Sequence, residues 1–480
     1  MSLFHRKSLE ELRAEADSGV LRRSLGPVQL TALGIGSIIG TGIFVLSGTA
    51  ASLHAGPGLW ISMIFAAVGC AFAGLCYAEL ASMIPVAGSA YTYAFATVGE
   101  FVAWIIGWDL VLEYALATAT VAVGWSGYFV SLMHTLGIEL PAQLTAAPGV
   151  MAMLPDGSES GVTGVFNLPA ALIVFFVAAL LIKGIKESAN ANTVMVVIKA
   201  AVLVVFVVAG INYIKPENLT PIIPPNTGVF GAFGWSGILQ ATGIIFFAYI
   251  GFDAVSTAAQ EARNPQRDMP IGILASLAIC TVIYVSVAIV LTGIVPYARL
   301  NVPDPLAVGI DATGLTWISP LIKVSALFGL FSTMIVTLLG QTRIFFAMSR
   351  DGLLPSMFSR VHERFRTPHL STALTGGIVA IAAGVTPIKI LGELVSMGTL
   401  FAFVLACIGI IILRKRQPDA PRPFRTPWSP VVPILGALAC ATMMWALPHE
   451  TKWRLVIWLA LGFIVYFGYG RARAARMRAA

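Results

Sequence analysis

Leu33-Gly34-Ile35-Gly36-Ser37-Ile38-Ile39-Gly40-Thr41-Gly42-Ile43-Phe44 is a hydrophobic stretch that contains four glycines. A second stretch, Phe246-Phe247-Ala248-Tyr249-Ile250-Gly251-Phe252-Asp253, lies at a matching place in the second half of the chain. Each glycine lowers helix propensity by about 1 kcal/mol relative to alanine, so we expect an interrupted helix at both places. Two broken hydrophobic helices at corresponding positions are typical of a transporter, whose substrate site they form.

The composition predicts an all-α membrane protein. Hydrophobic residues make up 57% of the chain and charged residues only 11%, and apolar runs of about 20 residues, each long enough to cross a bilayer, recur along it. The net charge of +7 comes from basic residues in loops, so we expect a lipid bilayer as partner and no nucleic acid. The five cysteines lie in apolar runs and resemble small hydrophobic residues, and we expect neither a metal site nor a cofactor.

Proline, glycine and charge divide the sequence into twelve predicted transmembrane helices. They are 27–54, 58–84, 99–133, 162–182, 189–211, 234–260, 270–295, 317–348, 370–386, 389–413, 428–447 and 453–470. Most Lys and Arg residues fall in the loops and tails on one side, which predicts that both termini are cytoplasmic. We therefore expect a multi-pass protein of a plasma membrane.

The interrupted spans are the first and the sixth, which predicts a five-plus-five inverted repeat with two extra C-terminal helices. The expected division is a cytoplasmic N-terminal segment (1–26), repeat 1 (27–211), an extracellular loop (212–233), repeat 2 (234–413), a cytoplasmic loop (414–427), helices 11 and 12 (428–470) and a basic cytoplasmic tail (471–480). The tail is expected to lie against anionic lipid.

Broken helices leave backbone groups that a ligand can satisfy. Amides near Thr41 and Gly42, at the start of the resumed helix, favour a carboxylate, whereas carbonyls of Phe247, Ala248 and Ile250 favour an ammonium group. Together with Ile39 and Gly40 they predict a site for the backbone of an α-amino acid. The alternative is a glycine-lined helix contact, because Gly36 and Gly40 have the spacing of small residues in packed membrane helices.

Four segments together resemble a known family. They are Gly34–Phe44, Gly107–Tyr114 (Gly-Trp-Asp-Leu-Val-Leu-Glu-Tyr), Phe247–Ile271 (through Glu-Ala-Arg-Asn-Pro-Gln-Arg-Asp-Met-Pro) and Gly340–Pro355 (Gly-Gln-Thr-Arg to Ser-Arg-Asp-Gly-Leu-Leu-Pro). In collinear order from about Arg22 to Pro448, they look like the cationic amino acid transporter family of the amino acid–polyamine–organocation superfamily. The resemblance implies the inverted-repeat fold of sodium-coupled symporters and transport by alternating access. Twelve predicted spans resemble the bacterial members, whereas vertebrate members have fourteen, so the resemblance also implies a bacterial inner membrane.

Lys199 stands in the middle of an apolar helix, where a lysine costs about 2.5–3.5 kcal/mol on insertion scales. The resemblance implies that it takes the place of sodium between the first and eighth spans and couples transport to protons. The alternative is that Lys199 extends its side chain toward the membrane surface.

Further candidates lie on the third and eighth spans. Asp109 and Glu113 share one helical face and are expected to pair with Lys199, to contact the substrate or to satisfy backbone groups. The eighth span offers candidates to complete the Lys199 site or the floor of the substrate pocket, namely Ser332, Thr333, Met334 and Thr337, although the register of this helix is open.

The sequence thus predicts a secondary active transporter that imports α-amino acids with protons and without sodium. The alternatives are an amino acid exchanger or polyamine carrier and, from another class, a membrane sensor that binds an amino acid without moving it. No pairing of nucleophile and base predicts an enzyme. The choice between cationic and small neutral substrates, and any partner protein, stay open.

Overall fold

The computed structural model of the chain describes residues 25–84, 89–153, 159–184, 189–253, 255, 262–315, 317–365 and 367–479. The predicted N-terminal segment 1–26 lies outside the described residues apart from its last two, Leu25 and Gly26. Leu25 forms a parallel bridge with Ala262, which fixes the start of the described chain beside the start of a later helix.

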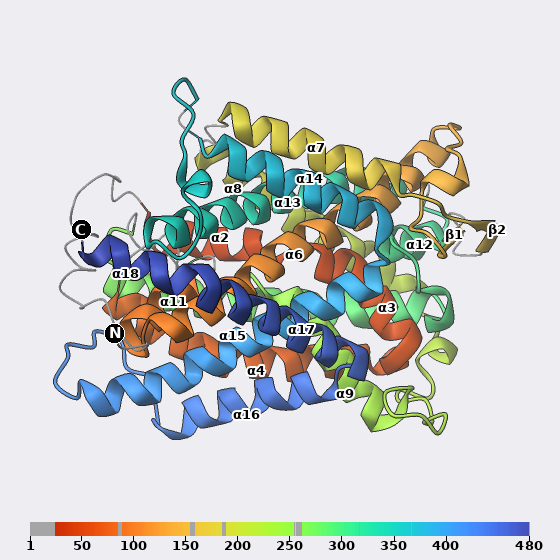
Figure 1. Cartoon of the computed structure of the whole chain (residues 1–480). Coiled ribbons are helices and arrows are strands. Elements are labelled where there is room, and N and C mark those ends of the chain that lie inside the picture. Colours follow the sequence, from red (N-terminus) through yellow and green to blue (C-terminus); the bar gives the residue numbers. More distant parts are fainter. Residues whose placement is uncertain are drawn as a thin grey trace.

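The described chain is mostly helical, because a helix satisfies its own backbone hydrogen bonds where water is absent. The helices and strands are named as in Figure 1, and η marks short turns of tighter or wider helix that the figure does not label. The first half contains α2 (Pro27–Ile38), η1 (Gly42–Leu46), α3 (Ser47–Ala50), η2 (Ala51–Ala55), η3 (Gly56–Gly58), α4 (Leu59–Met83), α5 (Ser89–Thr97), α6 (Glu100–Thr135), η4 (Ala142–Leu144), α7 (Leu168–Lys183), α8 (Ala189–Gly210), η5 (Ile211–Tyr213) and η6 (Pro216–Leu219). The second half contains α9 (Gly234–Ile245), η7 (Phe246–Tyr249), α11 (Pro265–Ile294), η9 (Tyr297–Arg299), α12 (Pro305–Asp311), α13 (Ser319–Arg350), η10 (Ser356–Ser359), α14 (His369–Val385), α15 (Ile388–Arg416), α16 (Val431–Ala446), α17 (His449–Val465), η11 (Tyr466–Gly470) and α18 (Arg471–Ala479).

Within the described ranges, seven helical stretches are long and apolar enough to cross a membrane. They are Gly42–Met83, Glu100–Thr135, Val194–Tyr213, Pro265–Ile294, Ser319–Arg350, Ile388–Arg416 and His449–Met477. Four apolar helices are shorter: Pro27–Ile38, Leu168–Lys183, His369–Val385 and Val431–Ala446. The chain is therefore a multi-pass membrane protein.

A small β-hairpin precedes α7. Its antiparallel strands are β1 (Met151–Met153) and β2 (Glu159–Thr163), with Met151 opposite Thr163 and Met153 opposite Glu159. The sequence placed the fourth span at 162–182, but α7 begins only at Leu168, so this predicted start was wrong. Asn167 fixes the start because its side-chain oxygen accepts a hydrogen bond from the Ala170 amide, as an N-cap residue does.

Long helices that cross the middle of the molecule form the core. The helix α6 packs along α13 and α15, and α11 packs along α4 and α2 (Figure 1). The pair α7 and α14 lies side by side at the top of Figure 1. Gly340 of α13 allows close approach to α6, because a Cβ there would lie 2.7 Å from a ring carbon of Tyr114. The interruption of α2 lies within this core.

A loop and a short helix cover one end of the bundle, on the right of Figure 1, where α12 lies. Pro303 and Pro305 pack against glycines of α6 and α3, respectively. The Lys323 ammonium group, on the first turns of α13, donates to Asp311 Oδ2 of α12 at 2.9 Å and to Thr135 Oγ1 of α6 at 3.0 Å. These bonds connect the covering segment to two core helices.

A second polar cluster holds the opposite end. The Glu79 carboxylate of α4 is fully buried and accepts two hydrogen bonds from Arg414 of α15, at 2.6 and 3.0 Å. It also accepts a bond from the Thr426 amide at 2.7 Å and lies 3.4 Å from the Arg422 guanidinium. The loop between α15 and α16 is thereby tied to α4.

The basic C-terminal segment is also helical. Its helix α18 follows η11 and lies on the left of Figure 1. Arg473 donates to the Leu354 carbonyl at 2.6 Å, and Gly352 packs against Ala474. The predicted tail 471–480 thus contacts the protein through Arg473 and Ala474, which the sequence had not indicated.

Candidate functional site

The first helix is interrupted at Ile39 and Gly40, inside the glycine-rich stretch. Helix α2 ends at Ile38, Ile39 is extended (φ −71°, ψ 101°), and helical backbone resumes at Thr41. The Ile38 carbonyl, which has left the helix, accepts a hydrogen bond from the Tyr284 hydroxyl of α11 at 2.9 Å. Thus a tyrosine of another helix satisfies one backbone group released by the break.

The second interruption follows α9. The chain tightens into η7 (Phe246–Tyr249), then Ile250 is extended (φ −60°, ψ 137°) and Gly251 adopts a positive φ of 121°. Residue 254 and residues 256–261, where the sequence predicts that the helix resumes, lie outside the described residues. The observed break therefore spans Phe246 to Asp253.

The two interruptions touch each other through glycine. A Cβ on Gly42 would collide with the Cα of Ala248, so only glycine lets the two backbones lie this close. A Cβ on Gly251 would lie 2.6 Å from the Ser37 carbonyl carbon. Six of the predicted binding residues, Ile39, Gly40, Thr41, Gly42, Phe247 and Ala248, are buried, and Ile250 is partly buried. The structure therefore brings the predicted binding residues of the first break and those of the second break next to each other.

The Thr41 hydroxyl lies in this place without a hydrogen-bond partner among the described residues, and Thr41 is 1% exposed. A buried hydroxyl without a partner costs about 1–3 kcal/mol, which a ligand that bonds to it would recover. Its position at the start of the resumed helix is the one that the sequence favoured for a carboxylate.

Lys199 is buried between three helices. It lies on α8 and is 1% exposed, and its Nζ donates to the Gly36 carbonyl of α2 at 3.1 Å and to Thr333 Oγ1 of α13 at 2.9 Å. Its aliphatic stem lies against Gly329, where a Cβ would be 3.1 Å from the lysine Cγ. Lys199 therefore does not extend to a membrane surface, and its ammonium group bonds the helix of the first break to α13.

The structure resolves the register of α13. Thr333 faces Lys199, and its methyl carbon would lie 3.2 Å from a Cβ on Gly40. Thr337, one turn later, instead accepts a hydrogen bond from Thr118 of α6 at 2.8 Å. The other two candidates of this helix, Ser332 and Met334, are buried. The sequence analysis named Thr333 among several candidates of this helix without choosing between them, and the structure places Thr333 at Lys199.

Asp109 and Glu113 lie on α6 against α15. Both are buried, and Asp109 Oδ1 would be 2.9 Å from a Cβ on Gly398. Neither Asp109 oxygen has a hydrogen-bond partner among the described residues, and the same holds for Glu113 Oε2. Neither Asp109 nor Glu113 lies within ion-pair distance of Lys199. The pairing with Lys199 that the sequence left open is therefore not observed.

A small apolar cluster lies beside the breaks and is separate from the main core. It consists of Leu46 from η1, Ala117 from α6, Phe247 from η7 and Val395 from α15. Ile250, just after η7, packs against it. Because four elements of the interrupted region each contribute one apolar side chain, this cluster gives the surroundings of the breaks a hydrophobic wall.

The sequence model of the Amino acid permease family matches residues 25–467. The chain belongs to this family. It is 47% identical to the methylthioribose transporter of Bacillus subtilis, over 98% of both chains. It is 46% identical to the branched-chain amino acid permease BcaP of the same species, again over 98% of both. A vacuolar cationic amino acid transporter of Arabidopsis thaliana is 39% identical over 87% of this chain and 64% of its own length.

The resemblance drawn from the four sequence segments is thus confirmed, because the family extends over nearly the whole permease chain. The permease is a transporter and not an enzyme, as the sequence predicted. Its substrate class is amino acids, whereas the names of its relatives specify three different kinds of small molecule.

Proposed function

We propose that this permease is a secondary active transporter that imports α-amino acids by alternating access, with proton coupling through Lys199 and without sodium. The proposal includes twelve membrane spans in a five-plus-five inverted repeat, with both termini cytoplasmic. The observation that carries it is the Lys199 ammonium group, which bonds to the Gly36 carbonyl of α2 and to Thr333 of α13.

A buried cation at this point connects the interrupted helix to a second core helix. Neutral oxygens of a carbonyl and a hydroxyl also suit a monovalent cation, so an ammonium group can take the place of a sodium ion. Loss of its proton removes the charge that attracts both oxygens, which weakens the contact between α2 and α13. A movement of α2 relative to α13 is then linked to proton release.

The substrate's backbone is proposed to bind at the touching breaks. Its carboxylate is directed to Thr41 and Gly42, where the Thr41 hydroxyl has no partner among the described residues. Its ammonium group is directed to the carbonyls of Phe247, Ala248 and Ile250. These carbonyls lie in η7 and at Ile250, which follows it. The helical hydrogen-bond pattern of α9 and η7 ends at Ile250.

We further propose an aliphatic substrate side chain, because the cluster of Leu46, Ala117, Phe247 and Val395 surrounds the breaks with apolar atoms. The relative named as a branched-chain amino acid permease agrees with this choice. The observation that favours a cationic substrate concerns Glu113, which lies one turn before Ala117 on α6. One of its carboxylate oxygens, Oε2, has no hydrogen-bond partner among the described residues.

The test of transport uses purified permease in proteoliposomes with radiolabelled leucine. An imposed pH gradient, acidic outside, should drive accumulation, whereas a sodium gradient alone should not. Uptake only into liposomes preloaded with amino acid would identify an exchanger. Leucine binding without flux would identify a sensor, and stimulation by sodium alone would contradict the role of Lys199.

The test of substrate class is a thermal-shift screen against the twenty amino acids and methylthioribose. Leucine, isoleucine and valine should stabilise most, since a ligand at 100 times its Kd contributes about 2.7 kcal/mol. The Glu113→Gln variant should keep this response. A response to arginine or lysine that is lost in Glu113→Gln would instead assign the cationic class.

A further inference from the structure

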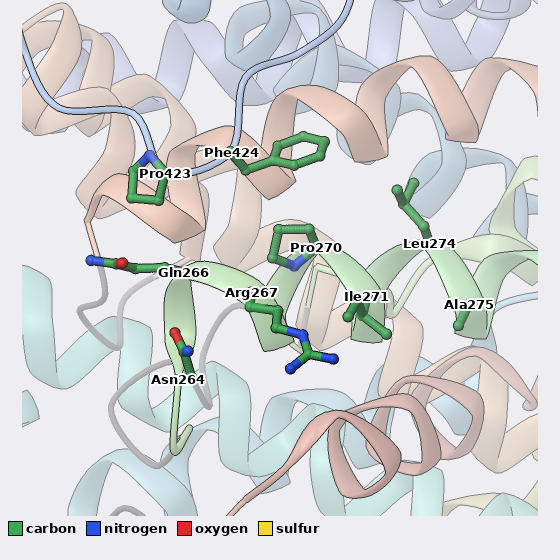
Figure 2. A pocket seen from close by; sticks show the side chains of 9 residues that line it. All are labelled: Asn264, Gln266, Arg267, Pro270, Ile271, Leu274, Ala275, Pro423 and Phe424. Carbon is green, nitrogen blue, oxygen red and sulfur yellow. The ribbon is translucent and has the colours of Figure 1, made fainter.

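A groove lies where the first turns of α11 meet the loop between α15 and α16. Figure 2 shows the side chains that line it, with Pro423 and Phe424 of the loop on one side and α11 on the other. Its volume is about 760 Å³. Polar side chains gather at one end of the groove, and Ile271, Leu274 and Ala275 follow along α11 toward the other end.

The polar end carries an uncompensated positive charge. Arg267 is exposed, and among the described residues no carboxylate lies within ion-pair distance of it. The adjacent Asp268 is buried, accepts a hydrogen bond from the Asn264 amide and is not one of the residues that line the groove. Arg422 of the facing loop is already beside Glu79, 3.4 Å away. The Arg267 guanidinium is therefore available to an anion.

The apolar end continues as a stripe that faces outward. Ile271, Ile279 and Val282 of α11 are 40%, 43% and 69% exposed, at helical spacing on one face. The rise from Asn264 to Ala275 is about 16 Å at 1.5 Å per residue. In a membrane protein such a stripe lies against acyl chains, so the groove joins the charged surface to the lipid-facing side of α11.

We propose that this groove binds one anionic phospholipid, with its phosphate on Arg267 and its acyl chains along Ile271, Leu274 and Ala275. The exposed side chains of Asn264 and Gln266 supply further hydrogen-bond donors for the headgroup. A guanidinium suits a phosphate because its planar array of N–H groups donates two parallel bonds. The ring of Phe424 covers the start of the chains. The positive charge of Arg267, which no carboxylate among the described residues balances, favours an anionic headgroup over a zwitterionic one.

The lipid also has a consequence for the protein around it. The groove has one wall on α11 and the other on the loop that Glu79 holds through Arg414 and Thr426. Therefore a bound lipid bridges α11 to α4 through this loop and stabilises their arrangement.

The experiment measures lipid retention by native mass spectrometry on the full chain, with phosphatidylglycerol and phosphatidylcholine as probes. Wild type should retain phosphatidylglycerol more strongly, and Arg267→Gln should weaken its retention about fivefold, as expected for one basic residue near an anionic lipid. Arg360→Gln removes an exposed arginine of the α13–α14 connection and is the matched control, with retention unchanged. Ala275→Trp fills the apolar part and should also lower retention without a change of charge.

Equal retention of the two lipids would overturn the proposal, and so would equal losses in Arg267→Gln and Arg360→Gln, which indicate only a general attraction to charge. A variant without residues 2–20 tests whether the chain's own N-terminus fills the groove. Increased phosphatidylglycerol retention in that variant would overturn the proposal, whereas unchanged retention supports it.

Discussion

Lys199 and Lys323 are two lysines of the same permease with almost the same burial, 1% and 2% exposed, but with different kinds of partner. Lys323 donates to the Asp311 carboxylate, so its charge is balanced by an opposite charge. The bonds that join Lys199 to α2 and α13 go to a carbonyl and a hydroxyl, which are neutral dipoles.

We interpret Lys323 as a structural cation and Lys199 as a cation that can change its contacts during a transport cycle. An ion pair with a carboxylate holds both groups charged and fixes α12 to α13. The bonds of Lys199 to the Gly36 carbonyl and to Thr333 depend on the positions of α2 and α13, so movement of either helix changes the energy of this cation. The Lys323–Asp311 ion pair therefore fixes two helices, whereas the energy of Lys199 changes when helices move. Variants of the two lysines can be compared directly.

The largest expected effect is on uptake driven by a pH gradient. Lys199→Ala should reduce leucine accumulation to the background of empty liposomes, because the proposed proton carrier is gone. Lys323→Ala should keep at least half of the wild-type response per folded protein. Full pH-driven uptake by Lys199→Ala in the same liposomes would contradict the proposal that Lys199, unlike Lys323, carries the coupled proton.

A smaller effect is expected from one partner of Lys199. Thr333→Val keeps the shape but removes the hydroxyl, which is one of the acceptors of Lys199. Loss of a buried hydrogen-bond partner costs about 1–3 kcal/mol, so pH-driven uptake should fall about tenfold. The matched control is Thr337→Val, because Thr337 lies on the same helix and bonds to Thr118. Equal loss in both variants would show that hydroxyls of α13 act only through folding.

For Lys323 the readout is stability. Lys323→Met leaves the Asp311 carboxylate without its cation, but Asp311 is 34% exposed, so we expect a loss of about 2 kcal/mol, below that of a fully buried pair. Thermal unfolding in detergent measures it. The double variant Lys323→Met/Asp311→Asn should recover most of the loss. No recovery would indicate that Lys323 contributes by packing instead of charge.

The smallest expected effect concerns Asp304, just before α12 and outside the membrane spans. Burial raises the pKa of Asp304 from 3.8 to about 6, against the opposing effect of Lys323. Since the carboxyl ionises more readily in the unfolded chain, it lowers folded-state stability as pH rises from about 4 to 6. Asp304→Asn should therefore raise the melting temperature at pH 7.5 by a few degrees and leave it unchanged at pH 4. A decrease at pH 7.5 would contradict the sign.

Much of the site could be predicted because glycine and charge are costly in apolar helices. The four glycines from Gly34 to Gly42 indicated where backbone leaves the helix, and Lys199 was conspicuous among apolar neighbours. The choice of Thr333 among adjacent hydroxyls could not be predicted, since neighbouring residues on a helix point about 100° apart and the sequence does not fix rotation.

Short elements were also missed, for a different reason. The segment with α12 is only seven residues long, too short for its apolar pattern to show a helical period, and it packs against distant glycines. The hairpin before α7 resembled the start of an apolar span until Asn167 was seen to cap the helix. The arginines of α18 suggested a lipid-facing tail, although one of them bonds to Leu354.

The docking of α18 has a practical consequence for handling the protein. Because Arg473 and Ala474 already contact the connection after α13, an affinity tag or fluorescent reporter fused at the C-terminal end would begin next to a packed contact. A spacer of several flexible residues after Ala480 should precede any such fusion. Truncation before Arg471 would expose the backbone around Gly352 and should lower expression yield.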